Sequence, residues 1–373
     1  YSRSSEALFI NDSVFELDGA GEAGHTASED PAINGGEQYI APVAASSKVA
    51  YEVPTDWTEM IELARQMIVD FPETFSEENR YDKDGNFNAV PICYDSADNL
   101  FISLCKMMGI NYTSLTAPTF NNDDVKNMLV QLKKWNNEGL ICTKDQLTWS
   151  KTAPQYHAYS TSMVNYGSVF MLISSTTSGM YLYADGYKAS VHSTPTAGKK
   201  DFPIFSSSDS GTHQTIAQGP SLVLFRNADT EVEKATFDFY KFLTNTDNSA
   251  GLAATTGYFP IRQSSNKTEE VQNLITAADI EVKEDSATPE SQKAKRDSYL
   301  GQSYKLNQEY QEEGCYFAAP VFDNDTGSSA ACRDAVGALV NAILDDHTVQ
   351  TDEEIRTLVD TEVASAFSNA ANG

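Results

Sequence analysis

Hydrophobic positions recur with helical spacing in five separated stretches of the chain, with apolar side chains three or four positions apart. The predicted helices cover residues 56–70, 122–138, 230–243, 336–344 and 351–363. Gly139 follows the second stretch, where a helix C-terminus favours glycine, and Thr230 with Glu233 forms a capping box for the third. Because each helix has one apolar face, we expect these faces to be buried in a core.

Two short runs, 168–173 and 221–225, are apolar on both faces, which is typical of strands covered on both sides. Strands that alternate with amphipathic helices predict an α/β fold. Residues 19–37, rich in Gly and Ser, predict a loop or an insertion, and residues 280–297 predict a solvated helix or loop.

The chain has 373 residues, which favours two domains over one. Its net charge of −27 is spread along the sequence and would repel nucleic acids and anionic membranes, so we expect neither as a partner. No apolar run reaches the length of about 18 residues that a membrane-spanning helix needs. No signal peptide is visible, and we expect residues upstream of Tyr1 to have been removed.

Sequence motifs for enzymatic chemistry are scarce. The five histidines have no ligand spacing, and neither a phosphate-binding loop nor a nucleophile elbow occurs. Asp82, Asp84 and Asn86 surround Gly85, but the spacing differs from that of a calcium loop, so we expect a turn between Tyr81 and Phe87. We therefore expect no metal and no cofactor.

The five cysteines include no CxxC pair, which argues against a structural zinc site. Their odd number leaves at least one free thiol. A bridge between Cys315 and Cys332 stays possible on the sequence alone.

Polar clusters at the ends of apolar segments are the best candidates for a binding site. Ser174, Ser175 and Thr176 follow the strand at 168–173, where hydroxyls and free backbone N–H groups would bind sugar hydroxyls or an anion. An ordinary helix cap is the alternative. The turn after a helix at 257–262 would let Tyr258 stack on a ligand ring and let Arg262 pair with a carboxylate across a cleft.

The order of these motifs resembles the extracellular solute-binding proteins of ABC importers, the superfamily of the maltose-binding and glycerol-3-phosphate-binding proteins. Six stretches carry the resemblance in sequence order: residues 4–11, 54–59, 167–175, 219–225, 239–243 and 256–262. The resemblance implies a two-lobe α/β fold of the type II periplasmic-binding class.

The resemblance also implies a division of the chain. Lobe two would hold residues 5–218 and 320–373, and lobe one would be represented only in part by residues 219–319. Residues 1–5 and 216–222 would cross between the lobes. In the family a long segment precedes the first crossing and builds most of lobe one, and this sequence lacks it.

The implied function is capture of a small polar solute, a sugar or an oligosaccharide, by hinge closure. An ABC transporter in the membrane would receive the solute from a monomeric protein located outside the cell, either lipid-anchored or periplasmic. The expected ligand-binding residues are Ser4, Ser5, Asn99, Phe101, Ser174, Ser175, Thr176, Gly219, Tyr258 and Arg262. Phe101 is as well explained as a core residue.

An arginine that glycerol-phosphate binders carry near a C-terminal Gly-Ser segment is not visible in residues 323–329, which favours a neutral carbohydrate over glycerol 3-phosphate. Two other classes stay open. A secreted carbohydrate-active hydrolase would use a pair of carboxylates, and a surface adhesion module would not change shape with a ligand.

Overall fold

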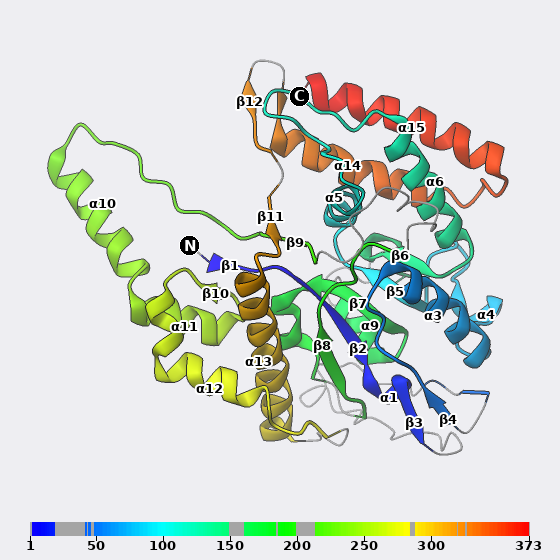
Figure 1. The fold of residues 1–373 in the computed structure, drawn as a ribbon, viewed down its shortest axis with the longest axis horizontal. Coiled ribbons are helices and arrows are strands. Elements are labelled where there is room, and N and C mark those ends of the chain that lie inside the picture. The colour runs from blue at the N-terminus through cyan, green and yellow to red at the C-terminus, as the bar shows by residue number, and fades with distance from the viewer. Residues whose placement is uncertain are drawn as a thin grey trace.

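The computed structural model describes residues 2–18, 42, 44–45, 48–148, 160–183, 186–198, 213–283, 288–318, 320–324 and 327–372. The loop predicted at 19–37 lies outside them. A large α/β part surrounds a five-stranded sheet, a smaller helical part adjoins it, and one extended stretch with a helix projects away from both (Figure 1).

The five-stranded sheet has the order β6-β5-β7-β2-β8. Its strands are β2 (Glu6–Asn11), β5 (Val90–Tyr94), β6 (Ile141–Thr143), β7 (Val169–Ser175) and β8 (Ala189–His192). β5 runs parallel to β6 and to β7, whereas β2 is antiparallel to both of its neighbours, with Leu8 opposite Ile173 and His192. The strand predicted at 168–173 is therefore confirmed as β7.

Helices cover both faces of this sheet, which explains why the four central residues of β2, 7–10, are all apolar. Leu8 and Ile10 enter one core, and Ala7 and Phe9 enter the other, as the two-residue period of a strand requires. The first core packs under α3 (Trp57–Asp70), α5 (Ala97–Met107), α6 (Asp123–Asn137), α14 (Ser329–Leu344) and α15 (Asp352–Asn372). The second packs under α9 (Ser160–Tyr166) and α13 (Pro289–Glu313).

Four of the five predicted helices have their apolar stripe buried, as expected, and these are α3, α6, α14 and α15. Local signals set their ends. Asp56 caps α3 by accepting the Glu59 backbone N–H at 2.9 Å, and Gly139, after α6, has φ 76°, a conformation that glycine adopts without strain. Thr351 and Glu354 exchange hydrogen bonds at the start of α15.

The smaller part consists of α11 (Thr246–Thr256), α12 (Glu269–Ala277) and one side of α13. Residues 280–297 were not expected to contribute to a core, yet α13 begins at Pro289 and packs in two directions. Tyr299 and Tyr310 enter the second core of the large sheet, while Leu300 and Tyr304 enter the core of the smaller part. The predicted boundary at residue 319 would place α13 in lobe one alone, whereas α13 packs against both parts.

The remaining elements are short. They are β1 (Ser2–Arg3), α1 (Asp12–Phe15), β3 (Glu16–Asp18), β4 (Lys48–Ala50), α4 (Glu77–Arg80), η1 (Lys144–Gln146), η2 (Thr176–Tyr181), β9 (Thr215–Ile216), β10 (Phe259–Pro260), η3 (Gln263–Lys267), β11 (Tyr316–Phe317), β12 (Asp323–Asn324) and β13 (Gly327–Ser328).

We call residues 219–243 the arm from here on. Their structure differs from what the sequence predicts. Residues 221–225 were expected to form a covered strand, but they pair with no strand in the described part of the chain, and Phe225 is 83% exposed. The helix α10 (Thr230–Leu243) forms at the predicted residues, but its cap is Asp229 rather than the predicted capping box of Thr230 and Glu233, and none of its residues is buried. The sequence pattern of residues 221–225 and of α10 is typical of buried elements, but none of the described residues covers their apolar side chains.

Candidate functional site: the crossings between the two parts

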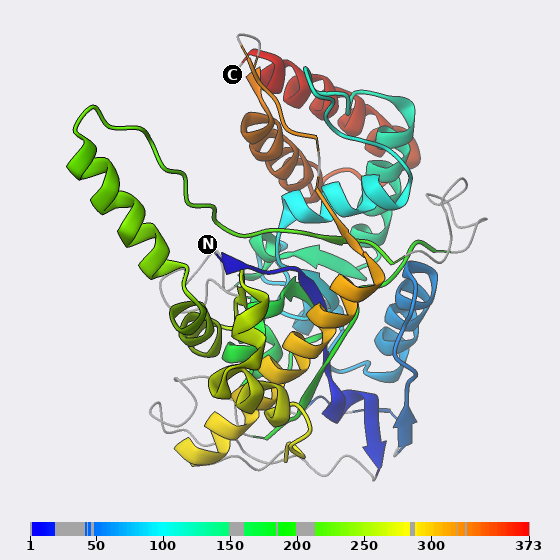
Figure 2. The same ribbon diagram turned by 60° about the vertical axis from the view of Figure 1, so that its left-hand side comes forward.

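Three chain segments run side by side where the large part meets the smaller one (Figure 2). Ser4 and Gln218 exchange backbone hydrogen bonds of 2.9 and 3.1 Å, which join the first segment to the second. β9 then pairs in parallel with β11, so that Thr215 lies opposite Tyr316. The expected crossings at residues 1–5 and 216–222 meet at this junction, although residues beyond Gly219 already belong to the arm.

A buried carboxylate lies at the centre of the junction. Glu6, on β2, is 2% exposed, and its two oxygens accept hydrogen bonds from Tyr94 Oη at 2.5 Å and from Asn99 Nδ2 at 2.8 Å. Asn99 Nδ2 also donates to Gln218 Oε1 at 3.1 Å. This chain of contacts ties the first crossing, the start of α5 and the second crossing to one another. We call Glu6, Tyr94, Asp98, Asn99, Gln218 and Arg333 the crossing network.

Arg333 extends the network from α14. Its guanidinium forms an ion pair with Asp98 and donates to Asn99 Oδ1. Residues 323–329 hold no arginine, but Arg333 follows them by one helical turn and reaches the junction. Because Asp98 pairs with it, the charge of Arg333 is compensated within the protein.

Burial raises the pKa of Glu6 to about 7. The hydrogen bonds from Tyr94 and Asn99 oppose this shift, and the nearby carboxylates of Asp98 and Asp95 add to it. The junction therefore contains a carboxyl group, that of Glu6, with a pKa near neutral pH.

The serine turn after β7 lies against the first crossing. The Thr176 backbone N–H donates to the Ser5 carbonyl at 2.9 Å, and Ser5 N donates to Thr176 Oγ1 at 3.3 Å. Ser174 is buried and bonds Ser178 at 2.8 Å between the two hydroxyls. Ser175 caps η2 and, like Thr177, is only partly buried, so these are the members of the turn that a solute could reach.

The tyrosine turn of the smaller part meets the serine turn. Gly257 ends α11 with φ 72°, and a Cβ placed on it would lie 3.4 Å from Thr177 Cα. Tyr258 follows and is half-buried. The two turns come from separate halves of the sequence and adjoin each other.

Two expected ligand contacts have other roles in the structure. Arg262 does not pair with a carboxylate across a cleft, because its guanidinium donates to the Thr244 carbonyl oxygen just after α10. Phe101 is fully buried and packs edge-on against Tyr112 and Phe120, so it is a core residue. The sequence pattern favoured neither role for Phe101, and its full burial among aromatic side chains assigns it to the core.

A cavity of about 250 Å³ opens at the first crossing. Ser4 lines it together with Phe259 from the turn after Tyr258 and Tyr316 from β11. The side chain of Arg3 and four side-chain amides also line it, and these amides are Gln263, Asn266, Asn307 and Gln311. Aromatic surfaces beside amides are the groups that hold a hydroxylated ligand.

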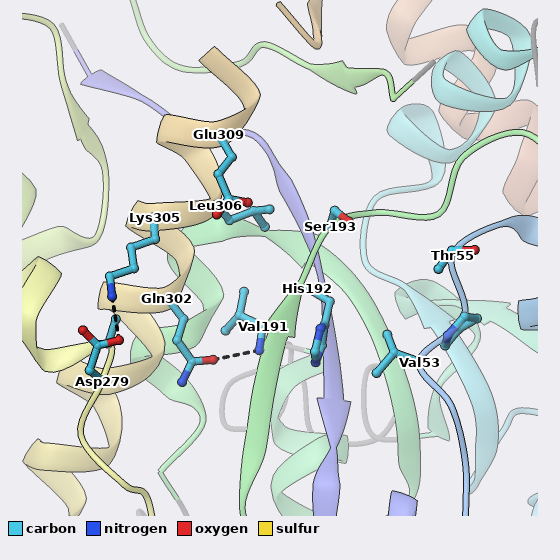
Figure 3. Close-up of a pocket in the computed structure, with 12 residues that line it drawn as sticks. Val53, Thr55, Val191, His192, Ser193, Asp279, Gln302, Lys305, Leu306 and Glu309 are labelled. Carbon is cyan, nitrogen blue, oxygen red and sulfur yellow. Dashed lines mark hydrogen bonds and ion pairs between the residues drawn. The ribbon is translucent and has the colours of Figure 1, made fainter. Parts of the chain in front are cut away.

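A larger groove of about 500 Å³ lies between β8 and α13 (Figure 3). Several of its polar groups already have partners. Gln302 accepts the Val191 backbone N–H at 3.0 Å, and Lys305 forms an ion pair with Asp279 at 2.6 Å. We therefore assign it no ligand.

Cysteines and candidate metal ligands contribute nothing to the site. All five cysteines are buried free thiols, so the possible bridge between Cys315 and Cys332 is wrong. Among the residues that the structure describes, no group of His, Cys, Asp or Glu is arranged to hold a metal ion. Residues 82–86 form the expected turn, in which Asp82 Oδ1 accepts two backbone N–H groups at 2.8 Å, from Asp84 and Asn86.

The sequence patterns did not indicate five members of the crossing network, namely Glu6, Tyr94, Asp98, Gln218 and Arg333. Only Glu6 carried a signal, because a charged residue opens the otherwise apolar run Ala7–Ile10. The others became visible only when the fold brought β2, α5 and α14 together.

None of the helices in the described ranges is long and apolar enough to span a bilayer. None of the curated proteins matches the chain in sequence.

Solved structures share the fold. A maltose-bound MalE3 of T. maritima superposes with a TM-score of 0.54 at 11% identity, over 98% of this chain and 71% of that one. UgpB from Mycobacterium tuberculosis, in complex with glycerophosphocholine, gives 0.54 at 11% identity over 98% and 69%. The substrate-binding protein Lmo0181 from Listeria monocytogenes, in complex with cycloalternan, gives 0.53 at 13% identity over 98% and 70%. These similarities establish the two-lobe α/β fold, and this chain spans about 70% of the length of each of these proteins.

The model of a protein family described as bacterial extracellular solute-binding proteins matches residues 2–279. That match covers more than half of the sequence, and the chain belongs to this family of solute-binding proteins.

Proposed function

We propose that the chain is the solute-binding subunit of an ABC importer and that it captures a sugar or a related polyhydroxylated solute at the crossings. The observation that carries this proposal is the cavity at the first crossing, where Ser4 and Tyr316 of the crossing segments meet Phe259 and the side-chain amides of the smaller part and of α13. Hydroxyl and amide groups match the hydrogen-bonding needs of a sugar, and the aromatic rings match its apolar faces.

Closure gives this arrangement its function. A solute that contacts the serine turn and the tyrosine turn at once binds the closed form better than the open form, and so shifts the population toward it. The paired crossing segments act as the hinge, because few residues there need to change conformation. The membrane subunits of the importer then recognise the closed form outside the cell.

The chain binds its solute without transforming it. Glu6 has the most perturbed carboxyl group at the junction, but it is almost fully buried and both of its oxygens are occupied by Tyr94 and Asn99. Asp98 is paired with Arg333, and Asp95 accepts a hydrogen bond of 2.5 Å from the Ser160 hydroxyl. A general acid must reach the bond it protonates, and these carboxylates are committed to the protein.

Calorimetric titration with maltose, maltotriose, ribitol and glycerophosphocholine, followed by chromatography of each mixture, tests this function. Binding of one of them with the compound recovered unchanged is the expected result. Ser175→Ala should weaken that binding by about tenfold, close to the ~1.4 kcal/mol of a hydrogen bond. Ser264→Ala, at an exposed serine of the smaller part, should leave it unchanged. Cleavage of one of the compounds would identify a hydrolase. Absence of binding to all four compounds would contradict the proposed solute capture.

A further inference from the structure

Two cysteines lie opposite each other on neighbouring strands of the five-stranded sheet. β5 and β6 run parallel, and their register places Cys93 against Cys142. Both side chains are fully buried and enter the second core, whereas Ile92 and Ile141, one position earlier on each strand, enter the first. The two thiols therefore project from the same face of the sheet into the same space.

The spacing of the strands brings the two thiols within bonding reach. Neighbouring strands lie about 4.8 Å apart, and a disulfide joins α-carbons that are about 4.4 to 6.8 Å apart. Burial raises the pKa of the Cys93 thiol well above its ordinary value, and a hydrogen bond with the Cys142 thiol adds to the shift. β6 lies at the edge of the sheet, with β5 as its one neighbour among the described strands (Figure 1), so it can adjust without breaking a second ladder.

The other three cysteines lie elsewhere. Cys105 on α5 and Cys332 on α14 are buried in the first core, on the opposite face of the sheet. Cys315 follows α13, and its thiol contacts the Glu313 carboxylate at 3.5 Å. Strand pairing therefore selects a single pair among the five cysteines.

We propose that Cys93 and Cys142 are an oxidation site and that they form an intramolecular disulfide while the chain folds outside the cell. The chain belongs to a family described as extracellular, and disulfides form and persist in such oxidising surroundings. The bond has to form before the second core closes, because neither thiol is exposed in the folded protein.

The oxidant is a second disulfide, either of a small molecule or of a protein. The thiolate of one cysteine attacks it, forms a mixed disulfide and releases one thiolate of the oxidant. The thiolate of the other cysteine then attacks the mixed disulfide, which forms the bond between Cys93 and Cys142 and releases the second thiolate. Two electrons pass to the oxidant, and its two released thiolates take up the two protons that the cysteines lose.

The bond closes a loop that contains α5 and α6. This loop of about 50 residues restricts the unfolded chain, and a long loop gives a large restriction. The bond also holds β5 at the position from which Tyr94, the next residue, donates to Glu6 in the crossing network.

Refolding of the reduced chain in a mixture of oxidised and reduced glutathione tests the proposal. After refolding, denaturation and maleimide labelling without reductant, mass spectrometry should find three labelled cysteines instead of five. Digestion with trypsin and chymotrypsin, which separates Cys93 from Cys105, should give a linked peptide pair that contains Cys93 and Cys142. Reduced protein that is already folded should keep five thiols in the same mixture, because the pair is buried.

Two alanine variants separate the bond from the loss of a buried thiol. In Cys142→Ala all four remaining cysteines should be labelled, whereas Cys105→Ala should show two of four. Reduction should lower the urea midpoint of wild type and of Cys105→Ala by about 1 M and leave that of Cys142→Ala unchanged. Both variants remove one fully or almost fully buried thiol, so their packing losses are matched.

Three results would overturn the proposal. The first is five labelled cysteines in wild type after oxidative refolding. The second is a linked peptide pair that joins any other two cysteines. The third is an equal response of the two alanine variants to reduction. None of these measurements uses a solute, so their outcome is separate from that of the titrations above.

Discussion

At the scale of single residues, the junction is defined by groups whose environment differs from that of the same residue in water. Glu6 is the strongest case, because it is buried among Tyr94, Asn99 and two nearby aspartates. Its sequence context indicated an unusual position, but its side-chain hydrogen-bond partners, Tyr94 and Asn99, lie 88 and 93 residues away. A pattern along the chain does not contain such contacts.

Glu6→Gln should change the pH dependence of stability. The folded-state pKa of about 7 exceeds the ordinary value of 4.5, so the folded protein binds more protons than the unfolded chain between these pH values. Wild-type stability therefore falls as the pH rises through this window, by about 2 to 3 kcal/mol between pH 5 and 8. The glutamine variant should lack this loss in urea unfolding, whereas Glu62→Gln, on the exposed side of α3, should retain it. Parallel profiles for wild type and Glu6→Gln would refute the shift.

Alanine substitutions at Phe101 and Tyr258 should distinguish a core residue from a ligand-binding residue. Phe101 is enclosed by Tyr112 and Phe120, so Phe101→Ala should cost about 3–5 kcal/mol in chemical denaturation. Tyr258 is half-buried at the turn, and Tyr258→Ala should weaken solute binding by tenfold or more in calorimetry with only a small loss of stability. The reverse outcome would exchange the roles assigned to the two residues.

At the scale of elements, the sequence predicted well where helices and strands form, but it predicted poorly what each of them packs against. α3, α6, α14, α15 and β7 follow from local periodicity and capping. α10 also forms where its pattern predicts, yet its face is open, because burial depends on a neighbour that no local pattern describes. The long helix α13 was missed because its polar and aromatic residues serve two cores at once, which blurs a single apolar stripe.

Replacement of glycine by alanine in two helices should change the stability of the protein in opposite directions. A Cβ on Gly301 would lie 2.3 Å from the Leu274 carbonyl oxygen, so Gly301→Ala must push α12 and α13 apart at a cost of about 1–3 kcal/mol. Gly251, inside α11, has nothing within 4 Å of that position. Gly251→Ala should therefore stabilise the protein by about 0.5–1 kcal/mol through helix propensity. Thermal unfolding measures both, and a neutral Gly301→Ala would mean that α12 and α13 are not in contact there.

At the scale of the whole molecule, two parts meet at three neighbouring segments, and the polar groups of the junction come from both. The two-lobe class and the crossings were predictable from the order of six short motifs. The crossing network was not, because Arg333 and Glu6 are brought together only by the packing of α14 and α5 on the sheet. The candidate site is thus a property of the assembled fold.

Small-angle X-ray scattering of the protein with and without a saturating solute from the calorimetric panel tests the central claim directly. Capture between two walls predicts a smaller radius of gyration in the bound state, with a mass that stays monomeric. Binding that leaves the scattering curve unchanged would contradict closure around the crossings.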